Sequence, residues 1–172
     1  MKHLVLFFML VASTFTIANA QSKDQLLTDW RRAKNYTKSY LDAMPDNGYG
    51  FKPTPEMRTF AAQMLHLADA NYTFAAAASG KPNPLGKNPD EKTVAQTKES
   101  TIKAVLDSYD FVINTIQGMT NEQLTEVIKF AGRDLSKTVI LNKAFEHQTH
   151  HRGQTVVYLR LKGVTPPEEM LF

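Results

Sequence analysis

Apolar residues recur at helical spacing along most of the chain. In the first stretch, Leu26 to Leu41 places an apolar side chain every three or four residues, which is the pattern of an amphipathic helix. Ser22 and Gln25 stand before it at the spacing of a capping box. Three more stretches show the same period. The expected helices span roughly residues 22–43, 54–79, 90–118 and 134–162.

Start and stop signals place the ends of these helices. Thr54-Pro55-Glu56 predicts the start of the second helix, because threonine caps, proline suits the first turn and an acid favours the helix N-terminus. Asp90 can cap the third helix, and Gly163 ends the last. A second capping box, Thr120 with Gln123, predicts a short helix.

Strand signals are almost missing. Residues 125–130 alternate weakly and could form a brief extended segment before Gly132 breaks it, but this segment is too isolated to found a sheet. Four long helices without a series of strands predict an all-α fold, an up-and-down four-helix bundle. The first helix is rich in aromatic residues and could form a homodimer interface.

Residues 1–20 have the features of a signal peptide. A short positive start precedes the apolar run from Leu4 to Val11, and Ala18-Asn19-Ala20 supplies small residues at the cleavage positions. We expect cleavage before Gln21 and a periplasmic or secreted domain at residues 21–172. The apolar run is too short to cross a bilayer, so no membrane span is expected after its removal. The alternative is a leader that stays attached as an anchor.

Composition narrows the chemistry. The 172 residues contain no cysteine, which excludes thiolate ligands, thiolate nucleophiles and disulfides. The net charge is only +3, and no basic cluster with interleaved aromatic residues is present. Nucleic acid is therefore not expected as a partner, and a small-molecule substrate is the better expectation.

The histidines are concentrated near the C-terminus. His147, His150 and His151 lie in one helical stretch, His66 lies in the second helix, and His3 falls in the leader. On a helix, His151 lies about 40 degrees from His147 and roughly 6 Å further along the axis, so both rings can reach one ion. Both share their side of the helix with apolar residues. His150 is less well aligned but remains an alternative ligand.

A third ligand would have to come from another helix, and His66 is the remaining histidine outside the leader. His66, His147 and His151 would form a metal site that leaves at least one position open for water or substrate. Imidazole ligands favour zinc or nickel, with iron or manganese as further candidates. The alternatives are hydrogen-bonded core histidines and a pH-responsive cluster without metal.

The C-terminal motifs are similar to those of a known family. His147-x-x-x-His151-Arg152-Gly153-Gln154, followed by residues 158–163 and Pro166-Pro167, resembles the C-terminal signature of the DinB/YfiT-like superfamily. Residues 51–72, including Leu65-His66-Leu67-Ala68, resemble the second helix of that family. The resemblance implies a four-helix bundle with a divalent metal held by His66, His147 and His151, and it makes His150 a neighbour.

The resemblance says less about the reaction. Relatives include thiol S-transferases that use low-molecular-weight thiols and a thiol-dependent isomerase, which implies a metal that activates a thiol or a water. Such thiols are mainly cytoplasmic, whereas this chain is expected to be exported, so a hydrolase is an equal hypothesis. A non-catalytic bundle that binds metal or a partner is the third.

Several other residues are candidates for supporting roles. Asp69 and Glu146 could accept hydrogen bonds from the ligand imidazoles, or could be solvated acids. Gln154 could orient a ligand, and Arg152 could bind an anionic group, although packing on the helix surface is the simpler interpretation. Two further residues complete the set: Gly153, expected to allow close helix approach, and Tyr158, expected in the core.

Overall fold

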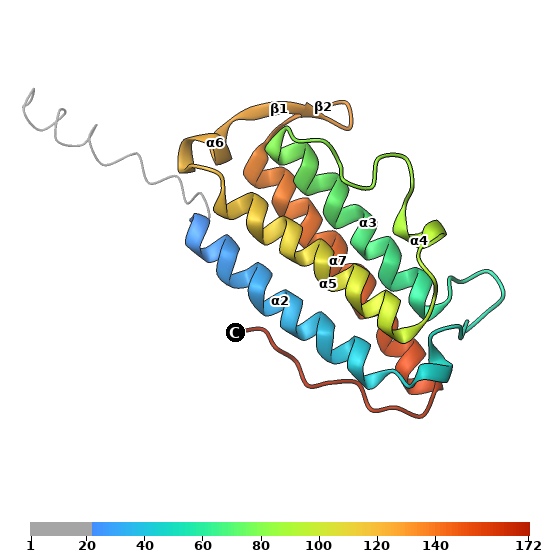
Figure 1. Cartoon of the computed structure of the whole chain (residues 1–172). Helices are drawn as coiled ribbons and strands as arrows, with labels where there is room; N and C mark the ends of the chain where they lie inside the picture. The colour runs from blue at the N-terminus through green and yellow to red at the C-terminus, as the bar shows by residue number, and fades with distance from the viewer. Residues whose placement is uncertain (1–21) are drawn as a thin grey trace, which may run out of the picture.

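The computed structural model describes residues 22–172, and its four long helices lie side by side (Figure 1). The predicted signal peptide, residues 1–20, lies outside the described residues. The long helices are α2 (Lys23–Ala43), α3 (Phe60–Ser79), α5 (Lys98–Gln117) and α7 (Lys137–Leu161). The short elements are η1 (Asp46–Gly48), α4 (Asp90–Thr93), α6 (Asn121–Thr125), β1 (Val127–Phe130) and β2 (Arg133–Ser136). The all-α bundle predicted from the sequence is confirmed.

The helix directions do not alternate at every step. The connector 80–97 runs back along the bundle, so α3 and α5 point the same way (Figure 1). A buried hydrogen bond from Asn71 to Ser108, 3.1 Å long, ties their middles together. α7 runs antiparallel to α3, and this places the first half of α3 against the second half of α7.

The second helix starts later than predicted. Thr54-Pro55-Glu56 stays in a turn, and α3 begins at Phe60 with Thr59 as its N-cap. The Thr59 hydroxyl accepts the Ala62 amide at 3.0 Å, while the Phe60 amide bonds back to the Phe51 carbonyl, also at 3.0 Å. Those tertiary bonds use the backbone that a longer helix would need, so residues 52–58 form a loop beside the bundle.

The expected third helix is divided in two. Asp90 opens only the four-residue α4, and α5 starts separately at Lys98, capped by Thr97. The capping box of Thr120 and Gln123 is confirmed at α6. The extended segment expected near residues 125–130 is present, but it is not isolated, because β1 pairs with β2 in an antiparallel hairpin.

The aromatic side chains of α2 are buried inside their own bundle. Trp30 is 0% exposed and meets the rings of Tyr109 and Phe145 edge-on, at centroid distances of 5.7 and 5.5 Å. Tyr36 and Tyr40 are also buried. These rings are therefore not available for the homodimer interface suggested by the sequence. Within residues 22–172, none of the helices has the length and apolar character needed to cross a bilayer.

Candidate metal centre

Three histidines meet where α3 packs against α7. His66 comes from α3, and His147 and His151 come from successive turns of α7. Each ring offers a nitrogen, and these three nitrogens lie within 4.8 Å of one another. The ring centroids are 4.2 Å apart for His147 and His151, and 4.7 Å for His66 and His151. The structure thus brings together the three residues singled out from the sequence.

The inward direction of the α7 pair follows from its helical face. Ile140, Ala144 and Tyr158, which share that side of α7, are each no more than 1% exposed. His151 is buried with them, whereas the His66 side chain keeps 30% of its surface exposed. The histidine cluster therefore lies at the edge of the core, with one ring partly open to solvent.

Burial keeps two of the rings neutral. It lowers the pKa of His147 to about 4 and that of His151 to about 3, and the neighbouring histidines and Arg58 add smaller effects in the same direction. Neutral imidazoles have a free lone pair for a metal. Nδ1 of His147 is buried without a hydrogen-bond partner among the described residues. Two neutral rings, one of them with an unpartnered nitrogen, fit a cation better than a hydrogen-bonded core.

Three side chains contact Nδ1 atoms of the cluster, and the first is Arg58, whose guanidinium lies 3.4 Å from Nδ1 of His66. Glu91, at the start of α4, lies 3.2 Å from Nδ1 of His66, and its other carboxylate oxygen accepts Arg58 Nε at 2.7 Å. The Gln63 amide lies 2.8 Å from Nδ1 of His151. Such contacts hold metal-binding imidazoles in place in known sites.

Sequence reasoning missed Gln63, Glu91 and Arg58. Gln63 had a usable signal, because a residue three positions before His66 lies on the same side of the helix. Glu91 had none, since it reaches His66 from an irregular connector 25 residues away.

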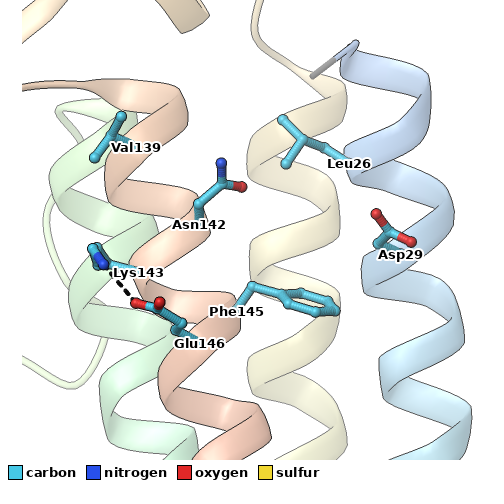
Figure 2. A pocket seen from close by; sticks show the side chains of 7 residues that line it. All are labelled: Leu26, Asp29, Val139, Asn142, Lys143, Phe145 and Glu146. Carbon is cyan, nitrogen blue, oxygen red and sulfur yellow. Dashed lines mark hydrogen bonds and ion pairs between the residues drawn. The ribbon is translucent and has the colours of Figure 1, made fainter. Parts of the chain in front are cut away.

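The two carboxylates predicted to accept hydrogen bonds from the histidines have other partners. Asp69 accepts the backbone amides of Asp90 at 2.6 Å and Glu91 at 3.2 Å, so it holds the N-terminus of α4. Glu146 pairs with Lys143 at 2.6 Å and lines a hollow of about 400 Å³ between α2 and α7 (Figure 2). No histidine is among the described residues that line this hollow. Neither carboxylate contacts a ligand imidazole. The alternative of a solvated acid describes Glu146, whose side chain is 70% exposed, whereas Asp69 acts on the helix that presents Glu91.

Arg152 is buried rather than on the helix surface. Only 6% of it is exposed, its guanidinium donates to Gln148 at 2.9 Å, and its Cζ lies 4.3 Å from the ring centre of Tyr36. It faces α2 and the core, so neither surface packing nor substrate binding at the histidines describes it. Gly153 is exposed and its Cβ position meets no atom within 4 Å, so it does not serve close helix packing.

The other two candidates agree better with expectation. Tyr158 is in the core, and its hydroxyl donates to the Arg58 carbonyl at 2.9 Å. Gln154 faces the ligand side, where its amide oxygen accepts from Gln63 and its nitrogen lies 3.0 Å from His150 Nε2. His150 itself is exposed and is not one of the three grouped histidines.

A polar cavity lies beside the cluster. Its volume is about 500 Å³, and its lining residues come from the 52–58 loop, α3, α4 and α7. They are Glu56, Met57, Arg58, Gln63, Glu91, Gln154 and Tyr158. Gln63 and Glu91 thus connect the cavity wall to His151 and His66. A small polar molecule could be held here within one side chain of the candidate metal ligands.

The DinB family model matches residues 16–170, which is nearly the whole chain. The chain belongs to the DinB family. Among curated proteins it is similar to YrdA of Bacillus subtilis, 24% identical over 86% of this chain and 87% of that protein. YjoA of the same organism is also 24% identical, over 83% of this chain and 92% of YjoA.

Solved structures share the fold. A DinB-like protein from Bacillus cereus matches with a TM-score of 0.73 and 22% identity, over 85% of this chain and 96% of that one. The DinB-like protein YjoA matches with a TM-score of 0.66 and 20% identity, over 86% and 96%. These similarities establish the DinB fold, and in this DinB protein the histidine cluster has the donor set for a metal ion.

Proposed function

We propose that this DinB protein binds one divalent metal ion through His66, His147 and His151 and uses it in catalysis. The observation that carries the proposal is the meeting of three imidazoles from two helices, with donor nitrogens within 4.8 Å of one another. The low pKa values of His147 and His151 keep both rings ready to bind at neutral pH.

The donor set narrows the choice of metal. Nitrogen ligands favour zinc or nickel over the hard cations calcium and magnesium, and iron and manganese are weaker candidates. No thiolate donor is available, because the chain has no cysteine. Three protein ligands are typical of catalytic sites, which keep a position for substrate or water.

The reaction class follows from what such an ion supplies. A divalent ion lowers the pKa of a bound thiol or water, which supports either thiol transfer or hydrolysis. The chain's own residues would bind and orient a small-molecule substrate in the adjoining cavity. Arg58 and Gln154 present polar groups at its wall, and Tyr158 fixes the backbone of Arg58 by its 2.9 Å hydrogen bond.

A non-catalytic metal-binding bundle is the second candidate function. It is favoured by one observation: none of the three histidines lines the cavity, whose wall contacts them through the side chains of Arg58, Gln63 and Glu91. In this alternative the ion would stabilise the packing of α3 against α7.

Cobalt substitution separates these functions. The metal-free protein is loaded with Co²⁺, which reports ligand changes by visible absorption, and is then titrated with cysteine and, separately, with acetate. A thiolate-to-cobalt charge-transfer band with cysteine supports thiol chemistry. A changed spectrum with acetate alone supports an open site suited to hydrolysis. A spectrum that neither probe alters supports the non-catalytic alternative.

We also propose that the protein is exported and acts in the periplasm or outside the cell. The support is the leader pattern of residues 1–20. N-terminal sequencing of protein from its native host should begin at Gln21; a sequence that begins at Met1 in a cytoplasmic fraction contradicts export. Size-exclusion chromatography of the same sample tests whether the protein is a homodimer, which would need a surface other than the buried aromatic rings of α2.

A further inference from the structure

A chain of polar side chains joins His151 to His150. The Gln63 amide contacts His151 Nδ1, the same amide contacts the Gln154 side chain, and Gln154 Nε2 lies 3.0 Å from His150 Nε2. Gln63 is only 3% exposed, so its amide is fixed by these contacts rather than by water. A buried amide that contacts two side chains has a fixed position and can orient the imidazole beside it.

The direction of the hydrogen bonds follows from the chemistry of imidazole. A neutral imidazole carries its proton on one ring nitrogen and a lone pair on the other. If His151 presents Nε2 to a metal, the proton is on Nδ1, and its partner must accept. The structure places the amide nitrogen of Gln63 2.8 Å from His151 Nδ1. A half-turn of the amide exchanges its nitrogen and oxygen without changing its shape, and brings an acceptor to that position.

The same reasoning extends along the chain. With its oxygen towards His151, Gln63 accepts a second hydrogen bond from the NH₂ group of Gln154 once the Gln154 amide, whose oxygen faces Gln63 in the structure, is turned in the same way. The oxygen of Gln154 then accepts from His150, whose Nε2 carries the proton. All four side chains find partners in this arrangement. In the opposite arrangement, Gln63 donates to His151 Nδ1, which places the proton on Nε2 and prevents His151 from binding a metal there.

We propose that Gln63 is a positioning residue that directs Nε2 of His151 to the metal, as Glu91 does for His66. Glu91 fits the parallel role, because a carboxylate can only accept. Its oxygen lies 3.2 Å from Nδ1 of His66, closer than the Arg58 guanidinium at 3.4 Å, so the proton of His66 is placed on Nδ1. Gln154 holds the ring of His150 at the outer end of the chain, so His150 is not a substitute ligand. The inference rests on the proposed metal site.

Metal affinity in designed variants tests the role of Gln63. Zinc dissociation constants are measured by competition with a chromophoric chelator for the wild type, Gln63→Leu and Gln63→Glu, with Gln117→Ala as the control on an exposed helix position. Gln63→Leu should bind zinc about 10–100-fold more weakly. Gln63→Glu, which keeps an acceptor, should stay within about tenfold of the wild type. The control should be unchanged.

The outcomes separate the two proposals. A wild type that does not bind zinc overturns the proposed function. A wild type that binds zinc no better than Gln63→Leu overturns only the role of Gln63, and so does a Gln63→Glu variant as weak as Gln63→Leu. Long-range ¹H–¹⁵N spectra of the zinc-loaded wild type give a readout that packing alone would not move: His151 should carry its proton on Nδ1. A proton on Nε2 contradicts the inference.

His150 provides an independent check. His150→Ala should bind zinc as tightly as the wild type, because the ring ends the hydrogen-bond chain without touching the ion. A loss of tenfold or more would make His150 a ligand and overturn this part of the assignment.

Discussion

Asp69 offers the sharpest test of how the fold presents Glu91 to the histidines. Its carboxylate accepts the amides of Asp90 and Glu91 at 2.6 and 3.2 Å, which are the first two amides of α4. Burial raises the pKa of Asp69, while the two backbone hydrogen bonds oppose that rise. The side chain therefore acts as a capping group contributed by a different helix.

Asp69→Ala should lower the free energy of unfolding by about 1–2 kcal/mol, the usual cost of losing a helix cap. For a domain of this size, each kcal/mol corresponds to roughly 2–4 °C, so the melting temperature of the metal-free protein should fall by about 2–8 °C. Asp69→Asn keeps an acceptor oxygen, so its melting temperature should fall by less than that of Asp69→Ala.

Asp107→Ala is the matched control, because Asp107 pairs with Lys103 on the exposed face of α5 and both side chains are about half exposed or more. That pair should contribute only about 0.3–0.5 kcal/mol. Thermal and urea unfolding with a chelator present give the comparison. If Asp69→Ala unfolds at the same temperature as Asp107→Ala, Asp69 does not hold α4, and the support for Glu91 must come from elsewhere.

Two further predictions concern stability. Gly153→Ala should stabilise the protein by about 0.5–1 kcal/mol in urea unfolding, because a Cβ there meets no atom within 4 Å and glycine weakens a helix interior; a destabilised variant would show that this face of α7 is covered in solution. Metal-free protein should lose stability as the pH falls from about 6.5 towards 4, because unfolded histidines take up protons there while His147 and His151, with pKa values of about 4 and 3, do not. The loss should be about 2–3 kcal/mol after allowing for solvent screening, and a His147→Gln/His151→Gln variant should show a flatter profile; an equal slope would assign the loss to other groups.

Helical periodicity predicted most of the fold, because each long helix has a continuous apolar face. The sequence-based prediction failed where the backbone makes tertiary hydrogen bonds. The start signal at Thr54-Pro55-Glu56 does not open a helix, because the amides of Phe60 and Ala61 bond to the carbonyls of Phe51 and Tyr49. The parallel course of α3 and α5 had no local signal, since it depends on where the irregular connector 80–97 turns.

The site shows the same division. The spacing of His147 and His151 fixes their common face, so the pair could be found from the sequence alone. The burial of a side chain could not be predicted in this way. A helical wheel gives the direction of Arg152 relative to His147, but it does not show that α2 packs over that side of the helix. Glu91, the partner of His66, could not be predicted from the sequence either, because it comes from a short helix whose position depends on Asp69.

Metal content tests the central claim most directly. Protein purified without a histidine tag is assayed by elemental analysis, alongside His147→Ala and His151→Ala variants and an exposed control, His150→Ala. The structure predicts about one divalent ion per wild-type and His150→Ala chain, and a strong loss in the other two variants. A wild-type protein without metal that also takes up none from solution, or metal content unchanged in His147→Ala and His151→Ala, would contradict the site.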